Sequence, residues 1–378
     1  MDANHHMKEA LTLAKKGLGK TSPNPMVGAV IVKDGKIVGK GYHKKVGELH
    51  AEIIAINEAK KNLGTHKLNS CLLYVNLEPC CHWGKTPPCT QEIMDVGIKE
   101  VHTSIIDPAP WVNGKGIEQL QKAGIKVIVG ESEEEAIELN YPYLKWVKTG
   151  IPFVILKAAI TIDGKIAKFR TDENYPKWIT NELSRKFVHK LRAQVDAVMV
   201  GIGTVIADDP ELTVRLVKGK SPKRIILDSN IRIPHEAKVL GNNCIIASVK
   251  NEREVPQLVR RGAEIWKINS DENGRVSLWD VLSKVGKAGI QSLLIEGGKE
   301  VFTEALSKGV VDKVYFFVAP KLIGNGIPVI RDIGKMITLS SVKFRKFGMD
   351  ILIEGRIPSI YFDQTLGGKK LYSKPNAD

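Results

Sequence analysis

The sequence predicts an α/β protein of two domains, for three reasons. Segments with the apolar pattern of strands alternate with amphipathic helical segments along most of the chain, and such alternation around one sheet produces an α/β layer fold. The chain has 378 residues, a length that suggests two or three domains. The run Thr149-Gly150-Ile151-Pro152 stops a helix and interrupts the alternation, so we place the domain boundary there.

The first predicted domain, residues 1–148, begins with a helix over 6–17. Two strand patterns follow, at 27–32 and 37–42, and Asp34-Gly35 between them is typical of a tight β-hairpin. The next elements we expect are a helix at 51–62, a strand at 71–76, a helix near 90–96, a strand near 99–106, a helix near 115–123 and a strand at 125–129. The segment 133–148 starts acidic and ends basic, which suits the dipole of a closing helix.

The second predicted domain, residues 151–358, opens with a strand at 153–159. We then expect helices near 181–193, 252–261, 278–288 and 299–308, and strands at 196–200, 223–228, 243–249 and 291–296. The last strand patterns should pair antiparallel and lie at 312–319, 337–346 and 349–357. Residues 359–378 are polar and are expected to form a loose tail.

Composition sets outer limits on the function. Lysine and arginine exceed aspartate and glutamate by 56 to 42, for a net charge of +14. Such a charge attracts nucleic acid, phosphorylated metabolites and phosphate-bearing cofactors alike, and a simply solvated surface would have it too. No run of about 20 apolar residues could form a membrane helix, and the first residues have no signal-peptide pattern. We therefore expect a cytoplasmic protein that does not span a membrane.

The cysteines point to a metal. Three of the five cysteines, Cys80, Cys81 and Cys89, fall within ten residues of each other, and a clustered, odd set without an export signal favours metal binding over disulfides. Upstream of them lies His50-Ala51-Glu52. Zinc prefers nitrogen and sulfur ligands, and a catalytic zinc site uses three of them with water in the fourth position. His50, Cys80 and Cys89 are therefore the predicted Zn²⁺ ligands.

Glu52 adds the chemistry of a deaminase to this site. It lies two residues after His50 near a helix start, where its carboxylate can face the water without binding the metal. It can take the water's proton and hand it to a departing nitrogen, while zinc lowers the pKa of that water toward about 7. His-x-Glu followed by Pro-Cys and a second Cys is the pattern of zinc deaminases of cytosine and adenine, although eight residues separate Cys80 from Cys89 here.

Two other ligand sets stay open at this stage. Cys81 is a rival thiol, but Cys80 directly follows Pro79, where the deaminase pattern begins, and we favour it. A closed and purely structural zinc site would need a fourth ligand, for which Cys81 and His82 are the candidates.

The residues around the ligands resemble one enzyme family. Thr86-Pro87-Pro88-Cys89 and the upstream Pro23-Asn24-Pro25-Met26-Val27-Gly28 are similar to segments of the bifunctional deaminase–reductases of riboflavin biosynthesis. The second half carries further motifs of that family: Leu156-Lys157-Ala158-Ala159, Asp163-Gly164-Lys165-Ile166-Ala167, Trp178-Ile179-Thr180, the run from Gly203-Thr204 to Arg215, and Glu296-Gly297-Gly298. The resemblance extends from about residue 6 to residue 357.

This resemblance implies two consecutive reactions. A cytidine-deaminase-like α/β/α domain in the first half would hydrolytically deaminate a diaminohydroxypyrimidine that carries a phosphoribosylamino group. A dihydrofolate-reductase-like α/β domain in the second half would then use NADPH to reduce the ribosyl group to ribityl, and no GxGxxG loop of a Rossmann domain is present. We expect a homo-oligomer that acts on this small-molecule substrate and has no nucleic-acid partner.

The resemblance also assigns residues to each role. The zinc ligands are again His50, Cys80 and Cys89, with Glu52 as the proton carrier. The implied NADP contacts are Ala159, Trp178, Thr204, Asp208, Ser229, Gly298, Lys299, Glu300, Val301, Phe302, Thr303 and Glu304. The implied contacts to the phosphoribosyl substrate are Arg192, Leu212, Arg215 and Glu296. Their chemistry fits, because glycines let a backbone approach a phosphate at a helix N-terminus and arginine binds phosphate through two hydrogen bonds.

One loop departs from the family. The short Thr-Gly-Glu/Asp-Ser stretch usual there is replaced by a segment about three residues longer, from Lys168 to Pro176. Pro176 takes the place of a serine that contacts substrate in the family, and Arg170 and Thr171 are the candidates to substitute for it.

Two other functions remain open from the sequence. The first is a nucleic-acid deaminase of the transfer-RNA type with an appended binding domain, although such enzymes normally have the short cysteine spacing. The second is a non-enzymatic module that uses zinc only for folding, in which Glu52 would have no proton to move.

Overall fold

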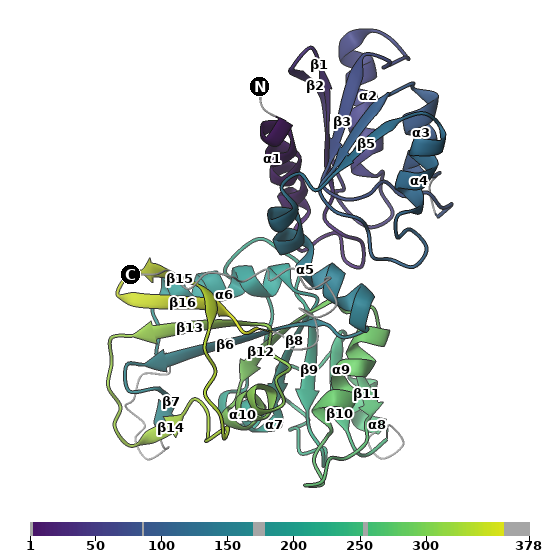
Figure 1. Cartoon of the computed structure of the whole chain (residues 1–378). Coiled ribbons are helices and arrows are strands. Elements are labelled where there is room, and N and C mark those ends of the chain that lie inside the picture. Colours follow the sequence, from purple (N-terminus) through teal and green to yellow (C-terminus); the bar gives the residue numbers. More distant parts are fainter. Residues whose placement is uncertain (1–2, 85–86, 169–177, 252–255, 359–378) are drawn as a thin grey trace. The chain divides into compact units, whose positions relative to one another are not determined.

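A computed structural model describes residues 3–84, 87–168, 178–251 and 256–358. The chain divides into two units, Met1–Thr149 and Gly150–Asp378, and each has helices packed on a sheet of its own (Figure 1). The α/β class predicted from the sequence is therefore confirmed. In the described parts of the chain, no helix combines the length and the apolar character that a membrane span requires.

The first unit is built on a five-stranded sheet in the order β2-β1-β3-β4-β5. The strands are β1 (Gly28–Lys33), β2 (Lys36–Tyr42), β3 (Cys71–Val75), β4 (Glu100–Thr103) and β5 (Lys126–Val129). β1 pairs antiparallel with β2 and β3, whereas β3, β4 and β5 run parallel. Asp34 and Gly35 both have positive φ at the turn between β1 and β2, which is the hairpin geometry that their sequence predicts.

Helices cover both faces of this sheet (Figure 1). On one face lies α1 (Ala3–Ala14), which a short 3-10 turn, η1 (Lys15–Gly17), extends. The other face carries α2 (Ala51–Leu63), α3 (Cys89–Asp95) and α4 (Lys115–Lys122), whose apolar side chains join those of the strands in one buried core. The unit ends with α5 (Glu133–Thr149).

Two glycines of β2 let the backbone of α2 approach closely. A Cβ atom on Gly41 would lie 2.1 Å from the carbonyl oxygen of Ala51, and one on Gly39 would lie 2.2 Å from that of Ala55. Any larger residue would therefore push the helix off the sheet. The N-terminus of α2, where His50 is the N-cap residue, is fixed by this contact.

The second unit is built on a nine-stranded sheet in the order β11-β10-β9-β8-β12-β6-β13-β16-β15. In chain order the strands are β6 (Phe153–Thr161), β8 (Ala197–Gly201), β9 (Lys223–Leu227), β10 (Cys244–Ser248), β11 (Ala263–Lys267), β12 (Ser292–Gly297), β13 (Lys313–Ala319), β15 (Ser340–Phe347) and β16 (Asp350–Arg356). The first seven in sheet order run parallel. The last pairings, β13 with β16 and β16 with β15, are antiparallel as predicted.

The helices of the second unit are α6 (Glu182–Gln194), α7 (Ile202–Asp208), α8 (Pro256–Arg260), α9 (Leu278–Lys287) and α10 (Lys299–Ser307). Alternate residues of the parallel strands enter two different cores. One core contains Met199 and Leu293 with apolar residues of α9 and α10, and the other contains Val198 and Val200 with residues of α7 and α8. Each face of the sheet is thus buried, as a parallel sheet requires.

Several short elements were missing from the sequence prediction. They are α7, β11 and the two-stranded sheet of β7 (Lys165–Lys168) and β14 (Gly326–Pro328). The strand expected near 99–106 is shorter, because β4 ends at Thr103. The predicted tail at 359–378 and the start of the helix expected near 252–261 lie outside the described residues.

Candidate metal centre and cofactor site

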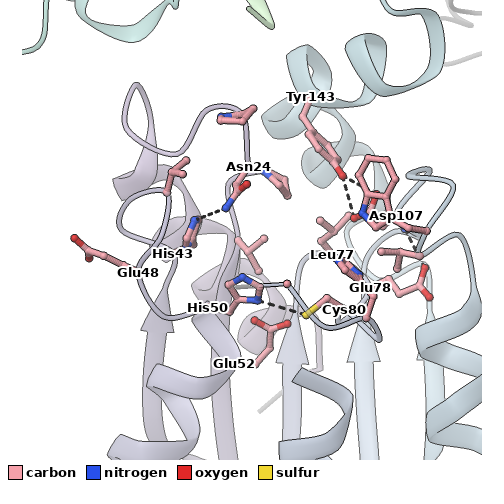
Figure 2. Close-up of a pocket in the computed structure, with 18 of the residues that line it drawn as sticks. Asn24, His43, Glu48, His50, Glu52, Leu77, Glu78, Cys80, Asp107 and Tyr143 are labelled. Atoms are coloured by element: carbon pink, nitrogen blue, oxygen red, sulfur yellow. Dashed lines mark hydrogen bonds between the residues drawn. The ribbon is translucent and has the colours of Figure 1, made fainter. Parts of the chain in front are cut away.

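Three segments bring the predicted zinc ligands together in the first unit. His50 precedes α2, Cys80 lies in the loop after β3, and Cys89 is the first residue of α3. The His50 Nδ1 atom is 3.3 Å from Cys89 Sγ and 3.4 Å from Cys80 Sγ. All three ligand atoms lie within 4.8 Å of one another, and Figure 2 shows His50 and Cys80 facing each other.

This arrangement fits zinc. A tetrahedral zinc ion with nitrogen at about 2.0–2.1 Å and sulfur at about 2.3 Å has these ligand atoms roughly 3.6 Å apart, close to the separations observed. Among the residues that the structure describes, no fourth histidine, cysteine, aspartate or glutamate joins the group. The Cys81 thiol is directed instead to the carbonyl oxygen of Trp111, at 3.9 Å. The geometry therefore favours an open site with three protein ligands over a closed one.

Hydrogen bonds among the ligands set their protonation. Cys80 Sγ accepts hydrogen bonds from the Cys89 side chain and from His50, and these lower the pKa of Cys80 to about 4. The bond with Cys80 raises the pKa of His50 to about 9. The same Cys80 contact and burial raise the pKa of Cys89. Of the two cysteines, Cys80 is therefore the one that favours the thiolate. Cysteine binds zinc as the thiolate and histidine as the neutral ring, so zinc binding would release the protons that His50 and Cys89 hold.

Glu52 is buried next to these ligands. It lies in the first turn of α2 and is 4% exposed, and Figure 2 shows its carboxyl group close to His50. Burial raises the pKa of Glu52, while the nearby His50 charge acts in the opposite direction. A carboxyl group in this position can carry a proton between a water molecule and a bound substrate.

A pocket of about 360 Å³ opens onto the metal ligands and has polar groups on its walls. On one wall, His43 Nε2 lies 3.1 Å from Asn24 Nδ2, and His43 Nδ1 lies 3.2 Å from the carbonyl oxygen of Leu49. On another, the Tyr143 hydroxyl lies 2.9 and 3.1 Å from the two carboxylate oxygens of Asp107 (Figure 2). Sequence reasoning missed His43, Asp107 and Tyr143, because each comes from a different segment outside the metal motif.

Glu78 fixes the loop that carries Cys80, and sequence reasoning also missed this role. Its side chain is buried and accepts four backbone N–H bonds of 2.8–3.2 Å, from Asp107, Gly114, Gly116 and Ile117. A Cβ atom on Gly116 would lie 2.2 Å from the carbonyl oxygen of Pro79, so the two segments touch through their backbones. The sequence holds one signal for this role, which is an acidic residue within the run Leu77-Glu78-Pro79-Cys80. A carboxylate that is buried in such a run needs hydrogen-bond partners.

In the second unit, the expected NADP contacts lie along one edge of the sheet. β9, β8, β12 and β6 are parallel neighbours, so their carboxyl ends share that edge. Near those ends lie Ser229 after β9, Thr204 and Asp208 in α7 after β8, Gly298 after β12, and Ala159 in β6. Open α/β sheets bind ligands just outside the carboxyl ends of their strands.

The turn between β12 and α10 fits a phosphate-bearing cofactor. Gly298 is the N-cap residue of α10 and no side chain caps the helix there. A Cβ atom added to Gly298 would lie 3.0 Å from the Thr204 hydroxyl oxygen, and one added to Gly297 would lie 3.1 Å from the same oxygen. The turn therefore presents bare backbone, and the N–H groups at a helix N-terminus attract phosphate.

Two further residues that the resemblance assigns, Trp178 and Leu212, differ in how far their side chains are exposed to a ligand. The guanidinium of Arg185 lies 4.9 Å from the centre of the Trp178 ring, and this ring is half exposed. The Leu212 side chain is buried in the core between α7 and the sheet. Leu212 could therefore contact a substrate only through its backbone. The departing loop, with Arg170, Thr171 and Pro176, lies outside the described residues.

Two of the expected substrate contacts bind each other. Arg192 donates to the Glu296 carboxylate through Nε at 2.6 Å and Nη2 at 2.9 Å, and through Nη1 to the carbonyl oxygen of Thr213 at 3.0 Å. Lys157 Nζ lies 3.8 Å from the same carboxylate. By contrast, Arg215 is half exposed and pairs with Glu211. Arg192 would therefore meet a substrate as half of a buried ion pair rather than as a free guanidinium.

We expect Arg192→Ala to destabilise the second unit by about 3–5 kcal/mol, because it leaves the Glu296 carboxylate buried without its main partner. Glu296 and Arg192 are 5% and 11% exposed in this pair. Urea unfolding of the full chain measures the loss. Arg215→Ala is the matched control and should cost at most about 1 kcal/mol, as exposed pairs do. Equal losses for the two variants would contradict the buried pair.

Two protein families match different parts of the chain. Residues 152–353 match the family described as the RibD C-terminal domain. Residues 1–105 match the cytidine and deoxycytidylate deaminase zinc-binding region.

The similarity to individual proteins covers nearly the whole chain. The riboflavin biosynthesis protein RibD of Aquifex aeolicus is 42% identical, over 92% of this chain and 97% of its own length, and that of Escherichia coli is 35% identical, over 92% and 96%. The solved structure of Acinetobacter baumannii RibD aligns with a TM-score of 0.84 at 34% identity, covering 94% of this chain and 98% of its own. A Thermotoga maritima structure, named as a diaminohydroxyphosphoribosylaminopyrimidine deaminase/5-amino-6-(5-phosphoribosylamino)uracil reductase, gives 0.82 at 40% identity with the same coverages.

Proposed function

The chain belongs to the RibD family of riboflavin biosynthesis proteins, and we propose which unit carries out each of its two reactions. It is a bifunctional deaminase and reductase. The first unit deaminates the diaminohydroxypyrimidine that carries a phosphoribosylamino group. The second unit then reduces the ribosyl group of the product to ribityl with NADPH. The observation that carries this proposal is the cluster of His50, Cys80 and Cys89 at a pocket that His50, Cys80 and the buried Glu52 line.

In the first unit, His50, Cys80 and Cys89 would hold zinc, which when bound supplies the Lewis acidity that makes water a nucleophile at neutral pH. Glu52 accepts the proton of the attacking water and delivers it to the amino nitrogen that leaves as ammonia. The polar walls of the pocket, with His43 and Asp107, can hydrogen-bond the edges of a small polar ring and orient it.

In the second unit, the backbone at Gly298 and the first turn of α10 would hold the diphosphate of NADPH, which supplies the hydride for the reduction. Ala159, Trp178, Thr204, Asp208 and Ser229 remain the other proposed cofactor contacts. The proposed substrate contacts are Arg192, Leu212, Arg215 and Glu296, with Arg192 and Glu296 acting as a pair. In this pair Arg192 fixes the direction of the Glu296 carboxylate, which can then accept hydrogen bonds from ribose hydroxyl groups.

The direct test supplies the phosphoribosylaminopyrimidine to the purified full chain with and without NADPH. Ammonia should be released in both cases, and the nicotinamide absorbance should fall only as the deaminated product forms. Transfer RNA serves as the second substrate, because a nucleic-acid deaminase was the main alternative. Deamination of the RNA without reaction of the free pyrimidine would overturn the proposal.

We further propose that the enzyme is a homo-oligomer without a nucleic-acid partner and that it works in the cytoplasm. All five cysteines are free, which suits a reducing compartment. At one edge of the larger sheet, β15 pairs with β16, and Phe344 and Ile351 on these strands are 70% and 49% exposed. Clustered apolar exposure of this kind marks association surfaces. Light scattering of the full chain should give a dimer or larger species.

A further inference from the structure

The first turn of α10 gathers positive charges from three places in the chain. The Glu300 carboxylate lies 2.6 Å from Arg331 Nη2, 3.7 Å from Arg275 Nη1 and 3.8 Å from Lys299 Nζ. Three cations thus surround one anion, and the cluster keeps a net positive charge. A surface of this kind attracts an anionic ligand.

Arg275 is the cation of this cluster that is best able to turn toward a ligand. Arg331 makes the close hydrogen bond to Glu300, and its backbone N–H is bonded to the Thr303 hydroxyl at 2.9 Å. Arg275 makes the longer contact to Glu300, and its side chain is 59% exposed. A guanidinium has five N–H donors in a planar fork, so Arg275 can keep the Glu300 contact and still present donors to an anion.

The backbone around Arg275 is tied to a second cofactor element. The Arg275 N–H donates to Asp271 Oδ1 at 2.8 Å, and the N–H of the next residue, Val276, donates to the Ser229 hydroxyl oxygen at 2.9 Å. Because Ser229 accepts this bond, its own hydroxyl proton remains available for donation. Arg275 therefore lies between Ser229, at the end of β9, and Glu300, in the turn after β12.

The spacing of these elements matches two parts of one dinucleotide. Only β8 separates β9 from β12 in the sheet, so the ends of these strands are about 10 Å apart. With the diphosphate at the backbone of Gly298, a dinucleotide that extends along this edge of the sheet toward β9 would bring one of its two nucleosides to the end of that strand. We assign the adenosine half to this side, because the cationic Arg275 next to Ser229 suits a phosphate and not the neutral nicotinamide ring. Ser229 and Arg275 are then the polar groups placed to meet the ribose of the adenosine.

We propose that Arg275, with the hydroxyl of Ser229, binds the 2′-phosphate that distinguishes NADPH from NADH. The inference rests on the proposed function, in which the second unit uses NADPH. The planar fork of arginine matches a phosphate with two parallel hydrogen bonds. NADH has only a hydroxyl group at that position, so it gains nothing comparable from the cation.

The test is titration calorimetry of the full chain with NADPH and with NADH. The unmodified protein should bind NADPH more tightly. Arg275→Ala should raise the Kd for NADPH about 10- to 100-fold, the usual effect of losing hydrogen bonds to a charged group, and should leave the Kd for NADH unchanged. Arg261→Ala is the matched control. Arg275 follows β11 in the chain, whereas Arg261 precedes that strand and pairs with Glu236. It should change neither Kd.

A second titration uses 2′,5′-ADP and 5′-AMP, which differ only in the 2′-phosphate. Arg275→Ala should abolish the preference for 2′,5′-ADP, and this readout requires neither substrate nor turnover. If the protein prefers NADPH and Arg275→Ala keeps that preference, or if the unmodified protein binds both dinucleotides equally, the role of Arg275 is overturned and the reductase function is not. If the unmodified protein binds neither dinucleotide, the proposed function itself fails.

Discussion

Glu52→Gln should retain zinc and lose deamination by about 10²–10⁴-fold, the usual contribution of general acid–base catalysis. The amide has nearly the size of the carboxyl group, so it fits the same buried place beside His50. It cannot take up and release the proton that the reaction must move. Ammonia release from the phosphoribosylaminopyrimidine measures the rate, and metal analysis of the same sample measures zinc.

Two controls separate this effect from general damage. Glu58→Gln makes the same chemical change on the same helix, where Glu58 accepts the N–H of Lys40 at 2.7 Å on the exposed side, and deamination should stay normal. The Glu52 variant should also reduce the already deaminated compound with NADPH at the normal rate, since the proposed cofactor residues all lie in the other unit. Deamination near the normal rate would refute the proton-carrying role. Loss of reduction would show that the two sites are not separable.

The metal centre could be predicted from the sequence because residue type and order alone carry its signal. Histidine and cysteine are the ligands that zinc prefers. His50 directly precedes α2 and Cys89 begins α3, whereas Cys80 lies in the loop after β3. The contacts between distant segments could not be predicted. Asp107 and Tyr143 are 36 residues apart, and Arg192 and Glu296 are 104 apart. Each of these residues alone resembles an ordinary surface or core residue until the fold pairs it.

The fold could likewise be predicted where the signal is local, and not where it depends on contacts between distant segments. Buried strands such as β6, with nine residues, and helices of ten or more residues have enough length for their periodicity to be recognised. The elements that the sequence did not reveal have three to seven residues. Equally short strands such as β8 and β10 were predicted, because each is a nearly continuous apolar run between turns. β7, β11 and β14 instead mix charged residues, glycine or proline into a few positions, so pairing with neighbouring segments decides their structure. The β7–β14 pair, for example, joins residues near 166 to residues near 327.

Cys89→Ala should lose both the bound zinc and all measurable deamination. Cys89 is fully buried at the first position of α3, with its sulfur 3.3 Å from His50 Nδ1, so no water or neighbouring side chain can readily replace it as a ligand. Only two protein ligands would remain, which is fewer than the three of catalytic zinc sites. Metal analysis after dialysis against a weak chelator measures the loss, and normal reduction of the deaminated compound shows that the chain has folded.

Cys81→Ala is the matched control, and it distinguishes the two ligand assignments that the sequence left open. Cys81 is the neighbour of Cys80, but its thiol is directed to the carbonyl oxygen of Trp111, so this variant should keep about one zinc per chain and its deamination. If Cys81→Ala loses zinc, Cys81 is a ligand, and the open site with a free position for water is wrong. If Cys89→Ala keeps zinc and activity, Cys89 is not a ligand. Cys89 is also more deeply buried than Cys81, so normal reduction of the deaminated compound by both variants is needed as the folding control. With that control met, a difference in zinc content reports which sulfur binds the metal.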